Sequence, residues 1–241
     1  MQIITCAVIK GGTGKTATCA SIAQCAAVDG KRVLVVDLDP QATITNMLGA
    51  DRTAPGALDL LQGGRIAETI QSTAQGIDVI GGAPGLATLK NNDIFALSRA
   101  LDPIKKQYDF IVIDTPPYFC NMTYFALQTA TGLIIPMQAD GGSLQGQEYI
   151  LQLAKEIKNT NKKLKVIGSI ITRYDNRPRI NRFMRGKIEE QGKAYKCPLL
   201  GTVSQGIAYA EAAALHRNLF IYAPKSKPAQ EYREIYNKIV K

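Results

Sequence analysis

The sequence has few of the features that mark membrane-spanning or secreted proteins. Its 241 residues contain no apolar run as long as the roughly 18 residues that first suggest a membrane span. A strand-like apolar run begins already at Ile3, which leaves no room for a signal peptide at the N-terminus. We therefore expect a cytoplasmic protein that needs no membrane.

Histidine and paired cysteines are also scarce. His216 is the single histidine, and because no carboxylate or cysteine neighbours it in sequence, we expect it to be structural. The five cysteines are odd in number and form no Cys-x-x-Cys pair. Cys6, Cys19 and Cys25 lie in apolar patterns, where a thiol behaves as a small hydrophobic group. This usage indicates a reducing compartment.

Positive charge is concentrated in the second part of the chain. Residues 155–241 hold 19 of the 29 Lys and Arg but only 7 of the 20 Asp and Glu, a net charge of +12. Residues 1–154 carry a net charge of −3. An excess confined to one part of a chain indicates a positive face. Nucleic acid is the anionic partner we expect first, and an anionic membrane surface second.

A glycine-rich loop follows the first apolar run and precedes a helical pattern. Its sequence is Ile9-Lys10-Gly11-Gly12-Thr13-Gly14-Lys15-Thr16. Strand, glycine-rich turn and helix form the context that a phosphate-binding loop requires. Glycines let successive backbone N–H groups converge on an anion, and the helix dipole acts on the same phosphates. Lys15 should reach the β- and γ-phosphates of a nucleotide, and the Thr16 hydroxyl should ligate its Mg²⁺.

A second lysine, Lys10, opens this loop. With it the chain resembles the ParA/Soj–MinD family of ATPases, whose deviant Walker A loop reads Lys-Gly-Gly-x-Gly-Lys-Thr. In that family the early lysine crosses a dimer interface and contacts the partner subunit's ATP. The resemblance implies that ATP binds to Lys10, Gly11, Gly12, Thr13, Gly14, Lys15, Thr16 and Ala17. Ala17 is a departure, because the family commonly has a Thr there that contacts the α-phosphate. The other interpretation of Lys10 is a solvated lysine at a strand end.

Acidic residues follow two further apolar runs. Val33–Val36 leads into Asp37-Leu38-Asp39-Pro40-Gln41, and Phe110–Ile113 leads into Asp114-Thr115-Pro116-Pro117. Sites of α/β sheets lie at these carboxyl ends. We expect Thr16, Asp37 and Asp114 to act on Mg²⁺, the last through its water shell. A capping role before the turn is the alternative for Asp37.

The family has the same Asp-x-Asp-Pro-Gln segment, and its second Asp positions the attacking water. The resemblance therefore implies that role for Asp39 and makes Lys10, Lys15 and Asp39 the catalytic residues. The family's Asp-Thr-Pro-Pro loop responds to the γ-phosphate.

The alternation of strand and helix patterns predicts the fold. Apolar runs at 33–36, 77–80, 110–113, 132–137 and 166–171 read as strands, and 16–29, 144–157 and 229–240 read as helices. Residues 43–48 and 57–61 suggest short helices, and 86–106 a broadly helical segment interrupted near Asn91-Asn92. We predict one α/β domain over residues 1–241, a doubly wound, mostly parallel sheet flanked by helices. Thr172, after a late strand, is a candidate adenine contact.

The densest basic segment runs from Arg173 to Lys187. Arg179, Arg182 and Arg185 recur every third residue and share one face of a helix, with Ile180, Phe183 and Ile188 expected on the other. Guanidinium groups suit backbone phosphates, which carry no sequence information. We expect DNA contacts from Arg177, Arg179, Arg182, Arg185 and Lys187. The alternative is a solvated helix face, with local pairing from Glu189 and Glu190 only.

The resemblance to the family extends over nearly the whole chain, with two informative departures near its end. The family binds DNA without sequence specificity, and Arg177 matches a family arginine with that role. A later family segment, Ile-Pro-Arg-Asn-Val-Arg-Leu-Ser-Glu-Ala, reads Val-Ser-Gln-Gly-Ile-Ala-Tyr-Ala-Glu-Ala at 203–212 and lacks both arginines. The segment 223–232 resembles the family's Asp-Pro-Lys-Ser-Lys-Gly-Ala-Gln-x-Tyr, and the membrane-binding helix that MinD proteins add beyond it is missing.

The resemblance implies an ATPase that partitions plasmid or chromosomal DNA. ATP and Mg²⁺ should favour a sandwich homodimer that binds nonspecific DNA on the nucleoid, and a centromere-binding, ParB-like adaptor should stimulate slow hydrolysis. Three rivals stay open. One is a positioning ATPase of the same family with a protein cargo, and another is a MinD-like membrane ATPase. The third is an electron-transfer ATPase with an iron–sulfur cluster, for which only Cys120 lies in a suitable loop.

Overall fold

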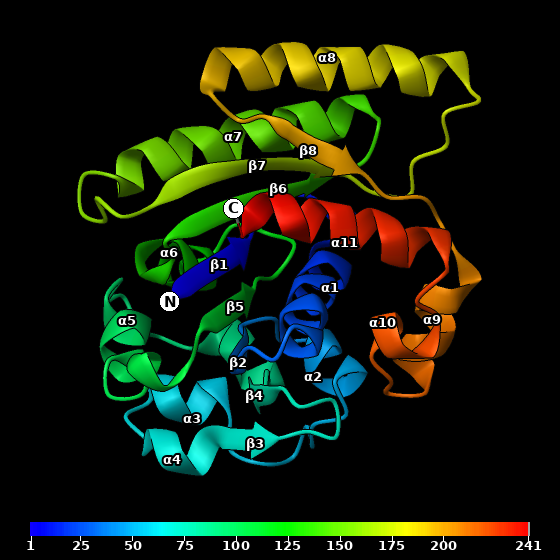
Figure 1. Cartoon of the computed structure of the whole chain (residues 1–241). Coiled ribbons are helices and arrows are strands. Elements are labelled where there is room, and N and C mark those ends of the chain that lie inside the picture. Colours follow the sequence, from blue (N-terminus) through cyan, green and yellow to red (C-terminus); the bar gives the residue numbers. More distant parts are fainter. Residues whose placement is uncertain (241) are drawn as a thin grey trace.

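The computed structural model describes residues 1–240, and in it eight strands form one sheet (Figure 1). The strand order is β3-β4-β2-β5-β1-β6-β7-β8, and every neighbouring pair is parallel except β3 with β4. The predicted doubly wound, mostly parallel sheet is confirmed. The strands are β1 (Gln2–Cys6), β2 (Val33–Asp37), β3 (Ile70–Ser72), β4 (Asp78–Ile80), β5 (Phe110–Asp114), β6 (Gly132–Met137), β7 (Lys165–Ile171) and β8 (Leu199–Thr202).

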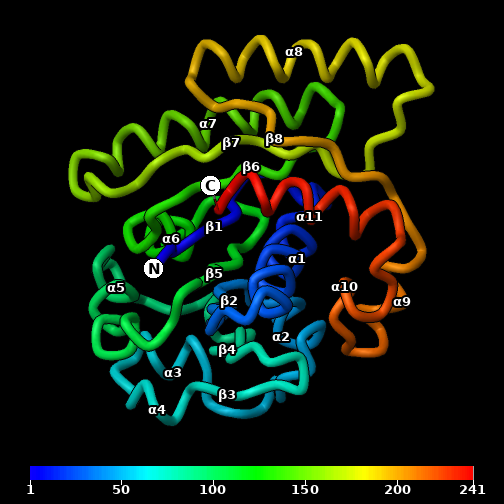
Figure 2. Tube along the Cα trace, in the orientation of Figure 1, coloured from blue at the N-terminus to red at the C-terminus, as the bar shows by residue number. Residues whose placement is uncertain are grey.

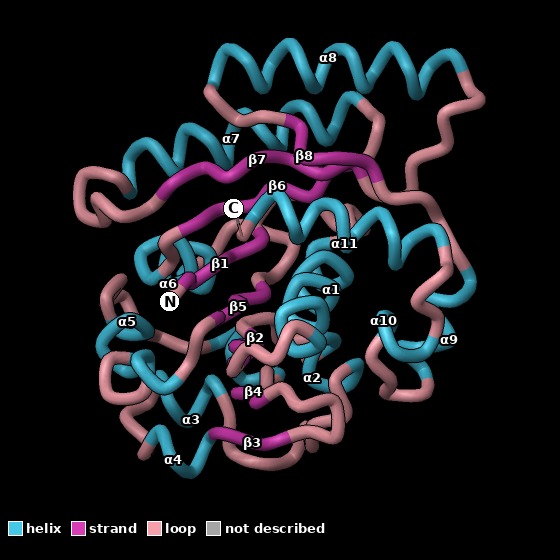
Figure 3. The backbone as a smooth tube through the Cα atoms, viewed as in Figure 1, coloured by secondary structure: helices cyan, strands magenta, loops and turns pink. Residues whose placement is uncertain are grey.

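Helices cover both faces of this sheet (Figure 3). One face carries α1 (Lys15–Val28), α2 (Thr43–Met47), α9 (Ile207–Ala214), α10 (Leu219–Tyr222) and α11 (Lys227–Ile239). The other carries α3 (Ala57–Leu61), α5 (Ala96–Leu101), α6 (Asn121–Thr129), α7 (Gly141–Ile157) and α8 (Arg179–Tyr195). The short α4 (Ile66–Thr69) and two 3₁₀ turns, η1 (Pro84–Thr88) and η2 (Lys105–Gln107), complete the chain.

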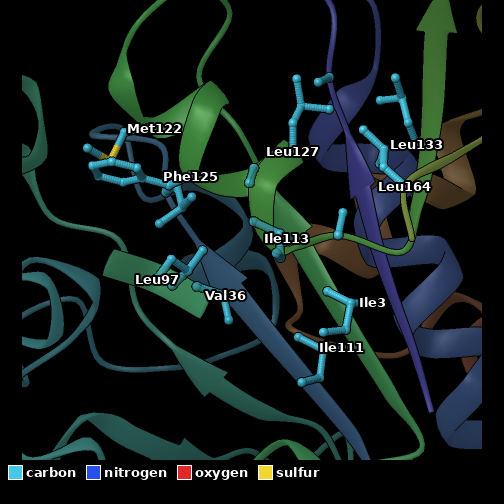
Figure 4. Close-up of a cluster of buried hydrophobic side chains, with 14 of the residues drawn as sticks. Ile3, Val36, Leu97, Ile111, Ile113, Met122, Phe125, Leu127, Leu133 and Leu164 are labelled. Carbon is cyan, nitrogen blue, oxygen red and sulfur yellow. The ribbon is translucent and has the colours of Figure 1, made fainter. Parts of the chain in front are cut away.

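Each face has its own apolar core because successive strand residues point to opposite sides. Ile3 of β1 packs into the core beneath α5 and α6, and its neighbour Ile4 packs into the core beneath α1 and α11. Figure 4 shows the first core, where Ile111 and Ile113 of β5 lie among side chains such as Phe125. Burial on both faces explains why these strands read as continuous apolar runs rather than alternating ones.

The register brings the polar ends of three strands together. Cys6, the last residue of β1, pairs with Asp114 at the end of β5, and Asp114 in turn pairs with Asp37 at the end of β2. The glycine-rich loop leaves β1 at this edge. The two acidic motifs and the loop, far apart in sequence, therefore meet at one point of the sheet.

The predicted elements of the central sheet are confirmed, and the segment 86–106 has the interruption expected near Asn91-Asn92. It contains only η1, α5 and the start of η2. The reason is local: the Asn91 side chain accepts a hydrogen bond from the Asp93 N–H (3.0 Å), and Asp93 accepts one from Phe95 N–H (3.1 Å). Such bonds favour turns over helix. The short elements β3, α4, β8, α9 and α10 had no prediction.

The expected apolar face of α8 is only partly buried. Ile188 is fully buried, whereas Ile180 and Phe183, which were expected on the same face, are 61% and 60% exposed. Near its C-terminus α8 lies on α7, where Gln191 donates to the carbonyl of Leu144 (3.0 Å). The N-terminal part of α8 extends past the start of α7 (Figure 2), so nothing covers it.

Candidate active site

The glycine-rich loop has the backbone conformation that its sequence predicts. Gly12 and Gly14 have φ angles of 75° and 81°, in the left-handed region that favours glycine. A Cβ at Gly14 would lie 3.0 Å from Thr172, whose hydroxyl donates to the carbonyl of Thr13 (2.8 Å). The Gln138 amide donates to the carbonyl of Gly12 (3.0 Å). The loop is thus held from two sides, with its N–H groups at the start of α1.

Lys15 is a buried cation at the centre of this loop. Its side chain is 6% exposed, and Nζ donates to the carbonyl of Lys10 (3.0 Å). Burial lowers the pKa of Lys15, and the charges of Asp114 and Asp39 act in the opposite direction. An ammonium group has three N–H donors, and only one of them is used within residues 1–240, so Lys15 can donate to further oxygen atoms. Its position suits the phosphates that the loop sequence predicts.

Asp37 is engaged on both carboxylate oxygens. Oδ1 accepts from the Asp39 N–H (2.9 Å), and Oδ2 accepts from the N–H (3.2 Å) and hydroxyl (2.7 Å) of Thr45. Burial raises the pKa of Asp37 to about 6. These three bonds use both lone pairs of Oδ2 and one of Oδ1. The geometry therefore favours the alternative role, in which Asp37 fixes the turn that carries Asp39 and the start of α2.

Asp114 retains an oxygen for a ligand. Its Oδ1 accepts from the Thr115 N–H (3.1 Å), whereas Oδ2 is buried and has no hydrogen-bond partner within residues 1–240. Burial, followed by the negative charge of Asp37, raises the pKa of Asp114 to about 8. Burial thus favours the neutral form of this carboxyl, and a bound cation would favour the ionised form. An orphaned carboxyl oxygen near the Thr16 hydroxyl fits Mg²⁺, which takes few protein ligands and completes its shell with phosphate oxygens and water.

A cavity of about 300 Å³ lies over the loop and has Asp39 at its rim. Asp39 is 7% exposed, and its Oδ1 accepts from the Gln41 N–H (2.9 Å), which orients the carboxylate. The cavity is lined by Gly11, Gly12, Thr13, Gly14, Lys15, Thr16, Ala17, Asp39, Thr43, Met47, Pro117, Arg173 and Tyr209. Seven of the predicted nucleotide-binding residues and Asp39 thus share one cavity.

A second cavity of about 200 Å³ adjoins the first. The two share Gly14, Ala17, Arg173 and Tyr209, and Thr172 lines the second one together with residues of the 203–210 segment. No carboxylate lines this cavity, and the adenine contact at Thr172 stays a prediction. Arg173 and Tyr209 had no predicted nucleotide role. Arg173 was counted with the basic segment, and only the folded chain places it here.

Lys10 stands apart from the other loop residues. It does not line the cavity. Its ammonium forms an ion pair with Asp140 and donates to the Ser143 hydroxyl (3.3 Å) at the start of α7. Lys15, and not Lys10, is therefore placed to bind the phosphates of a nucleotide in the same subunit. Lys10 is 28% exposed, so it can reach a neighbouring molecule if its pair with Asp140 opens.

The five basic residues predicted for DNA lie on α8 and the turn before it, and three of them have ion-pair partners. Arg177 pairs with Asp175 (2.8 Å), a partner that the sequence analysis did not count, although 90% of the Arg177 side chain is exposed. Arg185 pairs with Glu189 and Lys187 with Glu190, both at 2.9 Å. Arg182 donates to the carbonyls of Asn176 and Arg177. Arg179 is exposed and has no side-chain partner within residues 1–240.

The other sequence expectations have mixed outcomes. His216 has a structural contact, because its Nδ1 lies 2.6 Å from the carbonyl oxygen of Asn46. All five cysteines are free, and four of them are buried. Residues 1–240 hold no cluster of three or more His, Cys, Asp and Glu side chains suited to a metal ion, so any Mg²⁺ must take substrate and water oxygens. In the same range no helix is both long enough and apolar enough to cross a membrane.

Comparison with known proteins agrees with this geometry. A family model described as an AAA domain matches residues 1–166. The chromosome-partitioning ATPase Soj of Thermus thermophilus is 30% identical, over 96% of this chain and 92% of its own length.

Solved structures include a plasmid partition protein of Borrelia burgdorferi B31 bound to AMPPNP. It has a TM-score of 0.85 and 25% identity, covering 99% of this chain and 98% of that one. A cobyrinic acid a,c-diamide synthase of Mycobacterium smegmatis with bound ADP and magnesium has a TM-score of 0.81 and 28% identity. That similarity covers 100% of this chain and 94% of the other. Proteins of this fold family therefore bind nucleotide and magnesium.

The parallel sheet, the loop around Lys15 and the carboxylates beside it define a P-loop ATPase. Within that class, the match over residues 1–166 and the Soj relative show that the chain belongs to the ParA/Soj family of partitioning ATPases.

Lys15→Ala should abolish ATP binding, because no other side chain of the loop can neutralise the β- and γ-phosphates from within it. Calorimetry with ATP and Mg²⁺ measures this directly. Lys31→Ala removes an exposed lysine just before β2 and serves as the control, with affinity expected to equal the parent's. Unchanged affinity in Lys15→Ala would remove the phosphate-loop assignment.

Asp140→Asn should release Lys10. The Asp140 Oδ1 also accepts from the Ser143 N–H (2.8 Å) at the start of α7, and asparagine preserves such a cap while losing the charge. A partly exposed pair contributes up to about 1 kcal/mol, so ATP-dependent dimerisation should strengthen by up to roughly fivefold per pair. Light scattering with ATP and Mg²⁺ measures it. Lys10→Ala should keep monomer affinity for ATP and lose the dimer, and a dimer as stable as the parent's would mean that Lys10 does not cross the interface.

Proposed function

We propose that this protein is a DNA-partitioning ATPase that works as a nucleotide-dependent dimer. ATP and Mg²⁺ bind at the loop, two subunits associate face to face around the nucleotides, and the dimer binds DNA without sequence specificity. Slow hydrolysis, stimulated by a centromere-binding, ParB-like adaptor, returns the subunits to the monomer. The named activity of the Soj relative supports this reading.

The observation that carries the proposal is the position of Lys10. A loop lysine that served its own nucleotide would line the phosphate cavity, and Lys10 does not. Its ammonium lies outside that cavity on Asp140 and Ser143. A second subunit that approaches this face brings phosphates within reach of Lys10, and these oxygens can replace the carboxylate of Asp140. Dimerisation would then depend on bound ATP.

Hydrolysis follows from the arrangement around Asp39. Bound Mg²⁺ would neutralise charge that develops on the transferred phosphoryl group. Thr16 and Asp114 would hold it, and Lys15 would bind the phosphate oxygens. The hydrogen bond from Gln41 N–H orients the Asp39 carboxylate at the cavity rim, where it can accept a hydrogen bond from a water molecule. Because Asp39 would act as a single weak base, hydrolysis should be slow.

The proposed DNA-binding surface is the exposed N-terminal part of α8 and the turn before it. Surface ion pairs such as Arg177–Asp175 and Arg185–Glu189 contribute little to stability, so DNA phosphates can replace their carboxylates. Arg179 needs no such exchange. Ile180 and Phe183 are exposed on the same part of α8 and would add apolar contact area next to these cations.

A protein cargo is the second candidate for the same ATPase cycle. The contacts between nucleotide, Lys10 and Asp39 would be the same, and the cargo would be set by the adaptor. A neighbouring gene for a centromere-binding protein would favour DNA as the cargo.

Asp39→Ala should bind ATP with near-normal affinity and fail to hydrolyse it, which locks the dimer, because the loss concerns water positioning rather than phosphate binding. Asp39→Asn keeps an oxygen that can accept from the Gln41 N–H, so the turn is preserved while the charge is lost. This variant should also be inactive, which would show that the charge rather than the turn is required. Phosphate release and light scattering measure the two effects, with the exposed Asp51→Ala as control. Normal turnover in both Asp39 variants would make Asp39 structural.

DNA binding should depend little on sequence and fall steeply with salt, with a log–log slope of about −0.9 per phosphate neutralised. Arg177→Ala, Arg179→Ala, Arg182→Ala and Arg185→Ala should each reduce that slope by roughly one unit per contact, or about two in a symmetric dimer. ATP should strengthen binding by joining two surfaces, and ADP should not.

The measurement is a salt titration of DNA binding with ATP and with ADP. Arg65→Ala is the matched control, because Arg65 is an equally exposed, ion-paired arginine beside α4, at the opposite end of the molecule (Figure 1). Its slope should equal the parent's. If the slopes of all four arginine variants equal the parent's, these arginines form a solvated surface that does not bind DNA. The lysines near the C-terminus would then be tested next.

A further inference from the structure

Arg173 is an exposed cation at the candidate active site that has no partner in the chain. Its side chain makes no hydrogen bond or ion pair within residues 1–240. It lines both the cavity over the loop and the adjoining cavity. The basic residues of the neighbouring turn and of α8 line neither of these cavities. Arg173 therefore differs in its surroundings from the basic segment to which it belongs by sequence.

The backbone of Arg173 is held in an unusual conformation beside the loop. Its φ is 51°, in the left-handed region that favours glycine, and such a conformation persists only where neighbouring contacts hold it. On one side the Thr172 hydroxyl donates to the carbonyl of Thr13 in the loop (2.8 Å), and on the other the Tyr174 N–H donates to the carbonyl of Val203 (2.9 Å). Thr172 and Tyr174 are buried, whereas Arg173 between them is exposed. The turn thus fixes the point beside the loop from which this side chain extends.

The charges around the loop leave a role for a second cation. Lys15 and Arg173 are the two basic residues that line the cavity over the loop. The Lys15 ammonium lies near the carboxyl groups of Asp39 and Asp114, and Lys10 is ion-paired outside the cavity. A nucleotide would add further negative charge to this cavity. A guanidinium without a carboxylate partner suits that charge, because it can donate two parallel hydrogen bonds to phosphate oxygens.

The place of Arg173 between the two cavities indicates which phosphate it would meet. Four residues line both cavities, and Arg173 is the charged one among them. Lys15 lines only the cavity over the loop, and Thr172 lines only the other. If the β- and γ-phosphates lie at Lys15 and the base lies at Thr172, as the sequence predicts, the α-phosphate and the sugar lie between them. Of these two groups, the α-phosphate is the anionic one.

We propose that the Arg173 guanidinium binds the α-phosphate of the nucleotide held in the same subunit. Arg173 would then be a nucleotide-binding residue, whereas the basic residues from Arg177 onward would serve the proposed DNA surface. This inference rests on the proposed binding of ATP at the loop.

Arg173→Gln removes the charge and keeps an unbranched side chain. Calorimetry with Mg²⁺ should show about tenfold weaker binding of both ADP and ATP, as expected when hydrogen bonds to a charged group are lost. The melting temperature of the nucleotide-free protein should equal the parent's, because Arg173 makes no side-chain bond within residues 1–240. Unchanged affinity for both nucleotides would overturn the proposal, and so would a loss of affinity that comes with a lower melting temperature.

Arg217→Gln is the matched control. Arg217 is also exposed, has no side-chain hydrogen bond or ion pair within residues 1–240, and lines neither cavity. The change in net charge is the same as in Arg173→Gln, so a general effect of charge on nucleotide affinity would appear in both variants. The affinities of Arg217→Gln should equal the parent's, and an equal loss in both variants would overturn the contact at Arg173.

A series of nucleotides identifies the group that Arg173 binds. Competition with a fluorescent ADP analogue measures AMP and adenosine. Arg173→Gln should weaken AMP by the same factor as ADP and leave adenosine unchanged. A loss for ATP alone would place the guanidinium at the γ-phosphate, a loss for ADP without AMP at the β-phosphate, and a loss for adenosine at the base or sugar. Each of these three results would overturn the α-phosphate assignment.

A salt titration of DNA binding at saturating ATP separates this role from a role in the DNA surface. Arg173→Gln should keep the parent's slope, and a lower slope with unchanged ADP affinity would assign Arg173 to DNA and overturn the proposal. A parent protein that binds neither ADP nor ATP would overturn the proposed function together with this inference. Normal binding by the parent with unchanged binding by Arg173→Gln would overturn the Arg173 contact alone.

Discussion

The burial of Lys15 beside the carboxyl groups of Asp39 and Asp114 is the constraint on which the rest of the site depends. A buried ammonium is costly unless opposite charge lies near it, and Asp39 and Asp114 supply that charge. The carboxyl groups are themselves buried close together, which raises the pKa values of Asp37 and Asp114 to about 6 and about 8. Without ligand, burial therefore favours the neutral form of these two carboxyl groups. A nucleotide phosphate would pair with the Lys15 ammonium, and a divalent cation would pair with the carboxylates. The site therefore suits charges that the chain alone does not provide.

The central sheet and the phosphate loop could be predicted because their causes are local. Strands buried on both faces read as apolar runs, and the left-handed angles at Gly12 and Gly14 require glycine in the sequence itself. The acidic motifs could be placed at one edge because parallel strands end together, and the pairing of Cys6, Asp37 and Asp114 confirms that edge. Edge elements such as β3 and β8 are short and only partly buried, so they leave weak patterns.

The rest of the site depends on contacts between distant segments, which no local pattern encodes. The ion pair of Lys10 joins positions 130 residues apart, and Tyr209 reaches the loop from α9. Arg173 belongs by composition to the basic segment but lines the two cavities beside the loop, because β7 ends beside Gly14. Ile180 and Phe183 have the periodicity of a buried face, yet the helix carries them past the end of α7. Periodicity predicts which residues share a face, whereas only the packing decides whether that face is covered.

The nucleotide site and the proposed DNA surface are joined by a short stretch of chain, yet a dimer would explain the proposed ATP-dependent DNA binding more simply than a change within one subunit. Three of the five cations on and before α8 already have carboxylate partners, so one subunit would neutralise few phosphates on balance. Two such surfaces held together add their contacts, and the second binds at the effective concentration set by the first. Affinity for DNA can then follow the nucleotide state even if each surface keeps its conformation. In this arrangement Lys10 is the residue that links nucleotide to DNA, because it determines whether the two surfaces act as one.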